Sequence, residues 1–128
     1  MSKPGAWESL RGLRILLVED DPLICLDLQT SLSELEATVL AASDAPSALT
    51  LLSASTVDFA VLDFELGPTT SESIAAMAQA RHVPFLFLSG YSEHDGRFAN
   101  WPGIEVLVKP ISVITIARHI HQALGKPC

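Results

Sequence analysis

The stretch ILLVEDDP, residues Ile15 to Pro22, places four apolar residues directly before three acids and a proline. A short apolar run of this kind is typical of a buried strand, and proline suits the first turn of a helix. We interpret Asp21 as the N-cap of that helix. Glu19 and Asp20 then follow the end of a strand, where clustered negative charges repel one another unless a cation lies among them.

Four further apolar runs repeat this pattern along the chain. Runs rich in Val, Ile, Leu and Phe predict strands at Leu13–Val18, Thr38–Ala41, Phe59–Leu62, Phe85–Leu88 and Val106–Val108. Between most of these runs apolar residues recur at helical spacing, and Asp44 and Ser112 stand where N-caps would begin two of the helices. The connection before the last strand, SEHDGRFANWPG, predicts at most a short, irregular helix.

Strands that are apolar on both faces and alternate with helices predict a parallel sheet, because only strands covered by helices on both sides can be apolar throughout. The chain of 128 residues is long enough for one such domain. We therefore expect a doubly wound α/β domain with a five-stranded parallel sheet over residues 13–128. We expect residues 1–12, which contain Pro4, Gly5 and Gly12, to form a loose N-terminal leader.

The composition argues against two classes of partner. The chain has 15 acidic residues against 8 Lys and Arg residues, a formal net charge of −7, and so offers no strongly basic surface for nucleic acid or an anionic membrane. No apolar run approaches the roughly 20 residues that a membrane span needs. Because the first residues contain no apolar segment typical of an export signal, we expect a cytoplasmic protein.

Polar residues follow four of the five predicted strands at their carboxyl ends, the edge at which open parallel sheets bind their ligands. These residues are Glu19, Asp20, Asp63, Glu65, Ser89 and Lys109. Taken singly, each is an ordinary loop acid, loop serine or surface lysine. Together, the carboxylates favour a hard divalent cation with oxygen ligands, such as Mg²⁺, and the lysine and hydroxyl suit a phosphoryl group.

Four motifs, ILLVEDDP, AVLDFEL, FLFLSGY and VLVKP, together resemble the receiver domains of bacterial two-component response regulators. The resemblance extends from about Leu13 to Leu124, and the order and spacing of the motifs are similar to the family pattern. It implies a flavodoxin-like strand order, 2-1-3-4-5. It also implies a stand-alone, single-domain receiver, for which we expect no second domain.

Applied to this sequence, the resemblance implies that Asp63 accepts a phosphoryl group from a histidine kinase or a histidine phosphotransfer protein. Glu19 and Asp20 would bind or orient Mg²⁺ together with Asp63, and the backbone carbonyl of Glu65 would complete the ligands. Lys109 would pair with a phosphoryl oxygen. Such a protein catalyses at most its own phosphorylation and dephosphorylation, and is otherwise not an enzyme.

The remaining implications concern the switch and its partners. Ser89 would reach the phosphoryl group by a hydrogen bond, and the Lys109–Pro110 peptide bond would be cis. The downstream partner would be a protein, and the resemblance does not imply which one. It also leaves open whether the chain forms a homodimer.

The sequence departs from the family pattern at three places. Val106 stands where many receivers have an aromatic residue that is coupled to the hydroxyl, so a switch through that ring cannot operate. Our hypothesis is that Tyr91 takes over this role and moves when Ser89 shifts; packing as a simple loop aromatic is the alternative. The interval from Asp63 to Ser89 is short, and Glu65 adds a carboxylate that we expect to affect how fast water reaches the acyl phosphate.

Two other functions are compatible with the same residues. One is a docking module that keeps the fold without phosphorylation. The other is a small aspartyl-phosphate phosphatase, in which Glu65 would stand at the position of the general acid. We expect ordinary surface roles for the four histidines, since no two of them have the spacing of metal ligands, and Cys25 should be a small apolar residue on a helix face.

Overall fold

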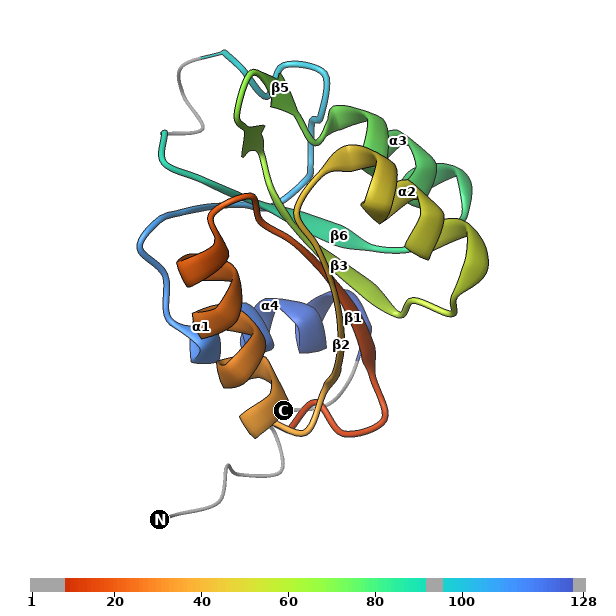
Figure 1. The fold of residues 1–128 in the computed structure, drawn as a ribbon, viewed down its shortest axis with the longest axis vertical. Helices are drawn as coiled ribbons and strands as arrows, with labels where there is room; N and C mark the ends of the chain where they lie inside the picture. Colours follow the sequence, from red (N-terminus) through yellow and green to blue (C-terminus); the bar gives the residue numbers. More distant parts are fainter. Residues whose placement is uncertain (1–8, 92–95, 126–128) are drawn as a thin grey trace.

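A computed structural model describes residues 9–91 and 96–125 (Figure 1). One sheet of five parallel strands runs through the centre of the molecule in the order β2-β1-β3-β6-β7. The strands are β1 Arg14–Val18, β2 Thr38–Ala42, β3 Phe59–Asp63, β6 Phe85–Ser89 and β7 Val106–Val108. Counting only these strands, the order is 2-1-3-4-5, so the predicted flavodoxin-like topology is confirmed.

Helices cover both faces of the sheet. Helices α1 (Pro22–Glu34) and α4 (Val113–Ala123) lie together on one face, and α2 (Ala45–Ala54) and α3 (Glu72–Ala80) lie on the other (Figure 1). Side chains of successive strand residues point to opposite faces. Ile15 and Leu17 therefore join the core beneath α1 and α4, whereas Leu16 and Val18 join the core beneath α2 and α3.

The predicted helix caps are present. The Asp21 carboxylate accepts hydrogen bonds from two backbone N–H groups in the first turn of α1. Asp44 caps α2 through the N–H of Ser47, a bond that lowers the pKa of the Asp44 carboxyl, and Ser112 caps α4 in the same way. These caps start each of the three helices shortly after the strand that precedes it.

A small hairpin follows β3 that the sequence did not predict. Its strands, β4 (Glu65–Leu66) and β5 (Thr69–Thr70), pair antiparallel through a turn in which Gly67 has a φ of 65°. Strands of two residues are too short to leave an alternating pattern. The hairpin occupies part of the short interval after Asp63 and fixes the position of Glu65.

The connection before β7 has no helix within its described residues, 96–105, as predicted. Phe98 and Trp101 anchor this segment by packing against Phe87 in the core. The Trp101 indole N–H also donates a hydrogen bond to Glu72 at the start of α3. Buried aromatic rings therefore replace the packing that a helix would have supplied.

Two expectations are corrected. The predicted leader is not loose throughout, since Leu10 is fully buried and its N–H donates to the Leu35 carbonyl; residues 1–8 lie outside the described residues. His121 is not at the surface but 6% exposed, because it follows Ala117 by one helical turn on the buried face of α4. His94 lies outside the described residues.

Candidate functional site

The carboxyl ends of β1, β3, β6 and β7 bring polar side chains to one rim of the sheet. Asp63 ends β3 and Ser89 ends β6, and both are buried. Glu19 directly follows β1 and is also buried, and Lys109 follows β7. The strands that carry them are neighbours in the sheet and run in one direction, so residues far apart in the sequence meet here.

Three carboxylates form a cluster at this rim. Glu19, Asp20 and Asp63 each offer an oxygen, and these oxygens lie within 4.8 Å of one another. Asp20 is exposed, and the second oxygen of Glu19 accepts the N–H of Asp21. Within the described residues, Oδ1 of Asp63 is buried without a hydrogen-bond partner. A buried, unpartnered carboxylate oxygen among further acids fits a hard divalent cation such as Mg²⁺.

Lys109 supplies positive charge to the same cluster. Its ammonium lies 3.1 Å from Oδ2 of Asp63 and 3.2 Å from Oε1 of Glu19. Burial, with the Glu19 carboxyl close by, raises the pKa of Asp63 to about 7, although Lys109 acts in the opposite direction. Burial also acts to lower the pKa of Lys109, but its two carboxylate neighbours more than offset this, so that pKa is raised.

Glu65 lies outside the carboxylate cluster and binds Ser89 instead. The Ser89 hydroxyl donates a hydrogen bond of 2.8 Å to Oε2 of Glu65, and the N–H of Gly90 donates to Oε1 at 3.3 Å. Arg97 Nη1 lies 3.4 Å from Oε2. These contacts link two strand ends to the segment before β7, and no sequence pattern signalled them. The role predicted for the Glu65 backbone carbonyl stays a prediction.

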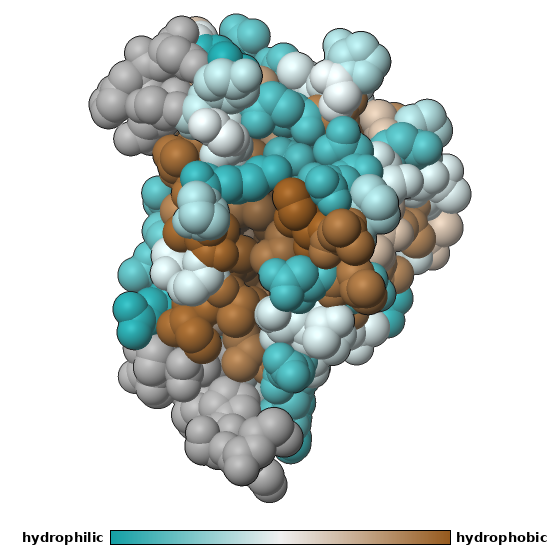
Figure 2. Space-filling view, turned by 60° about the vertical axis from the view of Figure 1, so that its left-hand side comes forward, coloured by the Kyte–Doolittle hydropathy of each residue, from teal (hydrophilic) through white to brown (hydrophobic). Residues whose placement is uncertain are grey.

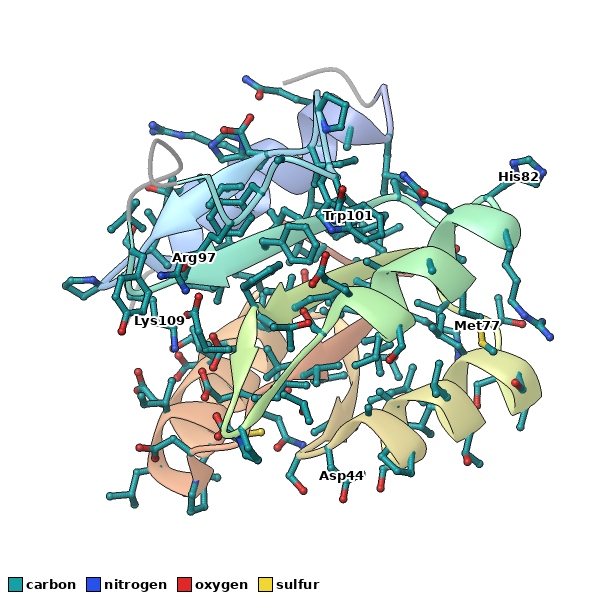
Figure 3. All side chains as sticks on the ribbon, turned by 90° about the horizontal axis from the view of Figure 1, so that it is seen from above. Asp44, Met77, His82, Arg97, Trp101 and Lys109 are labelled. Carbon is teal, nitrogen blue, oxygen red and sulfur yellow. The ribbon has the colours of Figure 1, made fainter. Side chains whose placement is uncertain are left out.

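Of the residues predicted to form the switch, Ser89 and Tyr91 are joined by a hydrogen bond, and Val106 lies in the core. Tyr91 is 52% exposed, and the Arg97 guanidinium lies 3.8 Å from the centre of its ring. The Tyr91 N–H donates to the Ser89 hydroxyl. Val106 is buried in the core, and as a valine it carries no aromatic ring. Figure 3 shows Arg97 and Lys109 at the same side of the molecule, with His82 at the opposite end.

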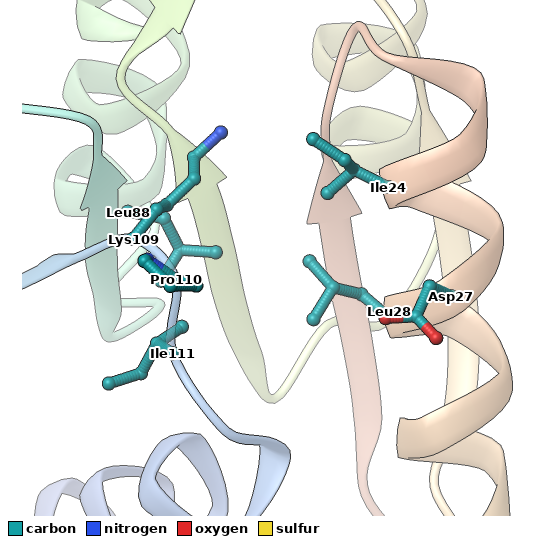
Figure 4. Close-up of a pocket in the computed structure, with 7 residues that line it drawn as sticks. All are labelled: Ile24, Asp27, Leu28, Leu88, Lys109, Pro110 and Ile111. Atoms are coloured by element: carbon teal, nitrogen blue, oxygen red, sulfur yellow. The ribbon is translucent and has the colours of Figure 1, made fainter.

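A groove of about 380 Å³ adjoins the carboxylate cluster. It lies between α1 and the segment after β7, where the Lys109–Pro110 peptide bond is cis, as predicted (Figure 4). Ile24 and Leu28 form one wall, and Pro110 and Ile111 form the other. Lys109 belongs to both the groove and the charged cluster, so the two are continuous.

Two further apolar side chains of α1 are exposed but do not line this groove. Leu23 and Leu26 are 78% and 62% exposed. Figure 2, which brings the α1 side forward, shows apolar side chains gathered there. Cys25 on the same helix is partly buried against the core, and burial and then Glu19 raise the pKa of its thiol. No helix in the described ranges is long and apolar enough to span a membrane.

Comparison with known proteins gives consistent results. A sensor histidine kinase of Pseudomonas protegens, GacS, is 29% identical over 133 residues, which cover 97% of this chain. The chain spans only 14% of the length of that kinase. A response regulator receiver protein of Sinorhizobium medicae superposes with a TM-score of 0.79 at 25% identity, covering 91% of this chain and 98% of that chain.

A second solved structure is the receiver domain of the sensor histidine kinase PA1611 of Pseudomonas aeruginosa, with a magnesium ion coordinated in its active-site cleft. It superposes with a TM-score of 0.78 at 24% identity, covering 90% of this chain and 99% of that chain. The family model of the response regulator receiver domain matches residues 15–121, which include all the rim residues described above. The chain therefore belongs to the response regulator receiver domain family of two-component signalling proteins.

Proposed function

We propose that this chain is a phosphoacceptor switch and that Asp63 is its acceptor. The observation that supports this most directly is the buried, unpartnered Oδ1 of Asp63, whose other carboxylate oxygen, Oδ2, lies 3.1 Å from the ammonium of Lys109. An Asp63 oxygen would form a bond to phosphorus while the bond from phosphorus to the donor histidine nitrogen breaks, and the imidazole would keep the electron pair. Such transfer depends mainly on positioning and on neutralising charge.

Glu19, Asp20 and Asp63 would hold Mg²⁺, which would neutralise charge on the phosphoryl oxygens. Lys109 would contact one of those oxygens, and the Ser89 hydroxyl would donate to another. The metal that the PA1611 receiver domain contains supports this assignment. The oxygen-only donor set and its geometry support it independently.

The groove beside Lys109 supports a protein as the phosphoryl donor. A donor histidine must approach Asp63 from the open rim, and Ile24 on α1, which is 38% exposed, lines the groove at that rim. We propose that the donor, a histidine kinase or a histidine phosphotransfer protein, places an apolar helical surface in this groove. The chain would then act on a downstream protein whose identity stays open.

The experiment is incubation with acetyl phosphate and Mg²⁺, followed by intact-mass measurement. We expect one phosphoryl adduct in the wild type and none in Asp63→Asn. Asp44→Asn is the matched control, because it removes a carboxylate at an exposed helix cap that asparagine also forms well. Steady turnover of many phosphate esters would favour a phosphatase instead, and neither adduct nor Mg²⁺ binding would favour a docking module.

A further inference from the structure

The Ser89 hydroxyl already has an acceptor in this structure, and that acceptor is the Glu65 carboxylate. Three donors converge on this one side chain, namely the Ser89 hydroxyl, the Gly90 N–H and the Arg97 guanidinium. A hydroxyl paired with a backbone N–H and a guanidinium is the kind of donor set that binds a phosphoryl group. Here a carboxylate from the chain itself occupies it.

A serine hydroxyl has a single proton to donate, so it can serve only one strong acceptor at a time. If Asp63 carries a phosphoryl group, the Ser89 proton must leave Glu65 to reach it. We propose that Glu65 is a positioning residue that competes with the phosphoryl group for Ser89 and thereby sets how readily Asp63 is phosphorylated. This inference rests on the proposed function.

The structure holds Glu65 firmly in this competing position. The residue is paired with Thr70 in the hairpin, directly after the buried Phe64. The side chains of Glu65 and Arg97 are 28% and 31% exposed, so water screens their ion pair only in part. Arg97 is itself stacked on the ring of Tyr91. The Glu65 carboxylate is therefore not a loose surface group that happens to meet Ser89.

The same contacts connect the exchange to the surface. The Tyr91 N–H donates a hydrogen bond to the Ser89 oxygen. A rotation of Ser89 toward Asp63 would therefore change the hydrogen bond of this amide. Glu65 is paired with Arg97 as well as with Ser89, so under this proposal it still has a partner nearby when Ser89 leaves. Release of Ser89 therefore changes the hydrogen bonding of the Tyr91 backbone and of the Glu65 carboxylate beside Arg97. Tyr91 and Arg97 belong to the part of the rim that a downstream partner can contact.

The test is a double-mutant cycle on the initial rate of Asp63 phosphorylation by acetyl phosphate at saturating Mg²⁺. The variants are Glu65→Ala, Ser89→Ala and the double variant. All of them keep the Glu65 backbone carbonyl. Glu65→Gln is added because its amide oxygen still accepts the Ser89 hydrogen bond without the charge. Glu34→Gln, an exposed residue at the far end of α1, controls for the loss of one negative charge.

We expect Glu65→Ala to be phosphorylated about tenfold faster than the wild type, the size of effect that loss of one charge-assisted hydrogen bond gives. Glu65→Gln should lie between the two, and Glu34→Gln should match the wild type. In the Ser89→Ala background, Glu65→Ala should have no effect. This last result separates competition for Ser89 from simple repulsion of the anionic donor, which would persist without Ser89.

A second readout needs no phosphoryl donor. The amide signals of Gly90 and Tyr91 in NMR spectra should shift in Glu65→Ala and stay unchanged in Glu34→Gln. Equal phosphorylation rates in the wild type and Glu65→Ala, or an acceleration that persists in Ser89→Ala, would overturn the role of Glu65 but not the proposed function. Absence of an adduct in every variant, including the wild type, would overturn the proposed function and this role with it.

Discussion

The ammonium of Lys109 lies 3.1 Å from the carboxylate of Asp63, although Asp63 ends β3 and Lys109 follows β7. Strand β6 lies between β3 and β7, so Lys109 reaches across it to meet Asp63. Oε1 of Glu19 lies 3.2 Å from the same ammonium. One cation thus faces two buried carboxylates, and the site carries more negative than positive charge before any metal or phosphoryl group binds.

This imbalance predicts how stability depends on pH when Mg²⁺ is removed with a chelator. The pKa of Asp63 is raised from 3.8 to about 7 in the fold, chiefly by burial. A raised pKa means that the folded state holds a proton which the unfolded state has lost. The stabilising contribution is therefore complete below about pH 4 and is lost as the pH rises through about 7.

Asp63→Asn cannot ionise, so it should not lose this contribution. We expect its melting temperature to exceed that of the wild type at pH 8 by roughly 5 °C, and to differ little at pH 4. Addition of Mg²⁺ at pH 8 should raise the melting temperature of the wild type and leave that of Asp63→Asn nearly unchanged. Parallel melting curves for the two proteins from pH 4 to pH 8 would contradict the raised pKa.

Asp20 should matter for metal binding and little for folding. It is the exposed member of the carboxylate cluster, whereas Glu19 and Asp63 are buried. We expect Asp20→Ala to weaken Mg²⁺ binding about tenfold or more, because the number of charged ligands largely sets the affinity of such sites. Calorimetric titration measures this affinity.

Asp21→Asn is the control for Asp20, since it changes the adjacent acid but keeps a residue that caps α1 well. Its Mg²⁺ affinity should equal that of the wild type. An Asp20→Ala variant that binds Mg²⁺ as tightly as Asp21→Asn would remove Asp20 from the metal site.

The sheet and most of the rim could be predicted from the sequence because their signals are local. Buried parallel strands are apolar throughout, caps are single residues at fixed positions, and a parallel sheet collects the residues after its strands at one edge. Glu19, Asp63 and Lys109 were found by this reasoning. The structure places them within contact distance, as that topology requires.

The contact between Glu65 and Ser89 had no such signal. It depends on a hairpin of two-residue strands and on Arg97, whose segment has no regular secondary structure. Nothing in the spacing of these residues indicates that their side chains meet. His121 differs in this respect, because the sequence does place it one helical turn after Ala117 on an apolar helix face. The surface role expected for it was wrong because it was based on the residue type and not on this position.

Glu65 also lies close enough to the rim to affect loss of the phosphoryl group, a separate step from its addition. Once Ser89 has turned away, the Glu65 carboxylate can accept a hydrogen bond from a water molecule and help orient it. We expect the phosphorylated form of Glu65→Ala to live about threefold longer than that of the wild type, a small general-base effect. The measurement is loss of the adduct, by intact mass, after acetyl phosphate is removed.

An unaltered lifetime would show that Glu65 does not act on the attacking water. Glu65→Gln refines the result, because an amide accepts a hydrogen bond but is a much weaker base. A lifetime of Glu65→Gln close to the wild type would indicate orientation of the water, and one close to Glu65→Ala would indicate proton abstraction.

The groove beside Lys109 predicts a difference between protein and small-molecule donors. Ile24 lines this groove, is 38% exposed and lies on α1 across from Pro110 (Figure 4). Ile24→Glu places a charge where we propose that the donor's apolar helix packs. We expect phosphoryl transfer from a cognate histidine kinase or phosphotransfer protein to slow by about tenfold or more, since burying an unpaired charge at an interface is costly.

Acetyl phosphate is the internal control for Ile24→Glu, because a small donor reaches Asp63 without occupying the groove. The rate of phosphorylation by acetyl phosphate should change less than about twofold, because Ile24 is partly exposed to water that screens the new charge and is not a member of the carboxylate cluster. Equal slowing with both donors would place the effect at the metal or the acceptor. Unchanged transfer from the protein donor would show that the donor approaches Asp63 from another side of the rim.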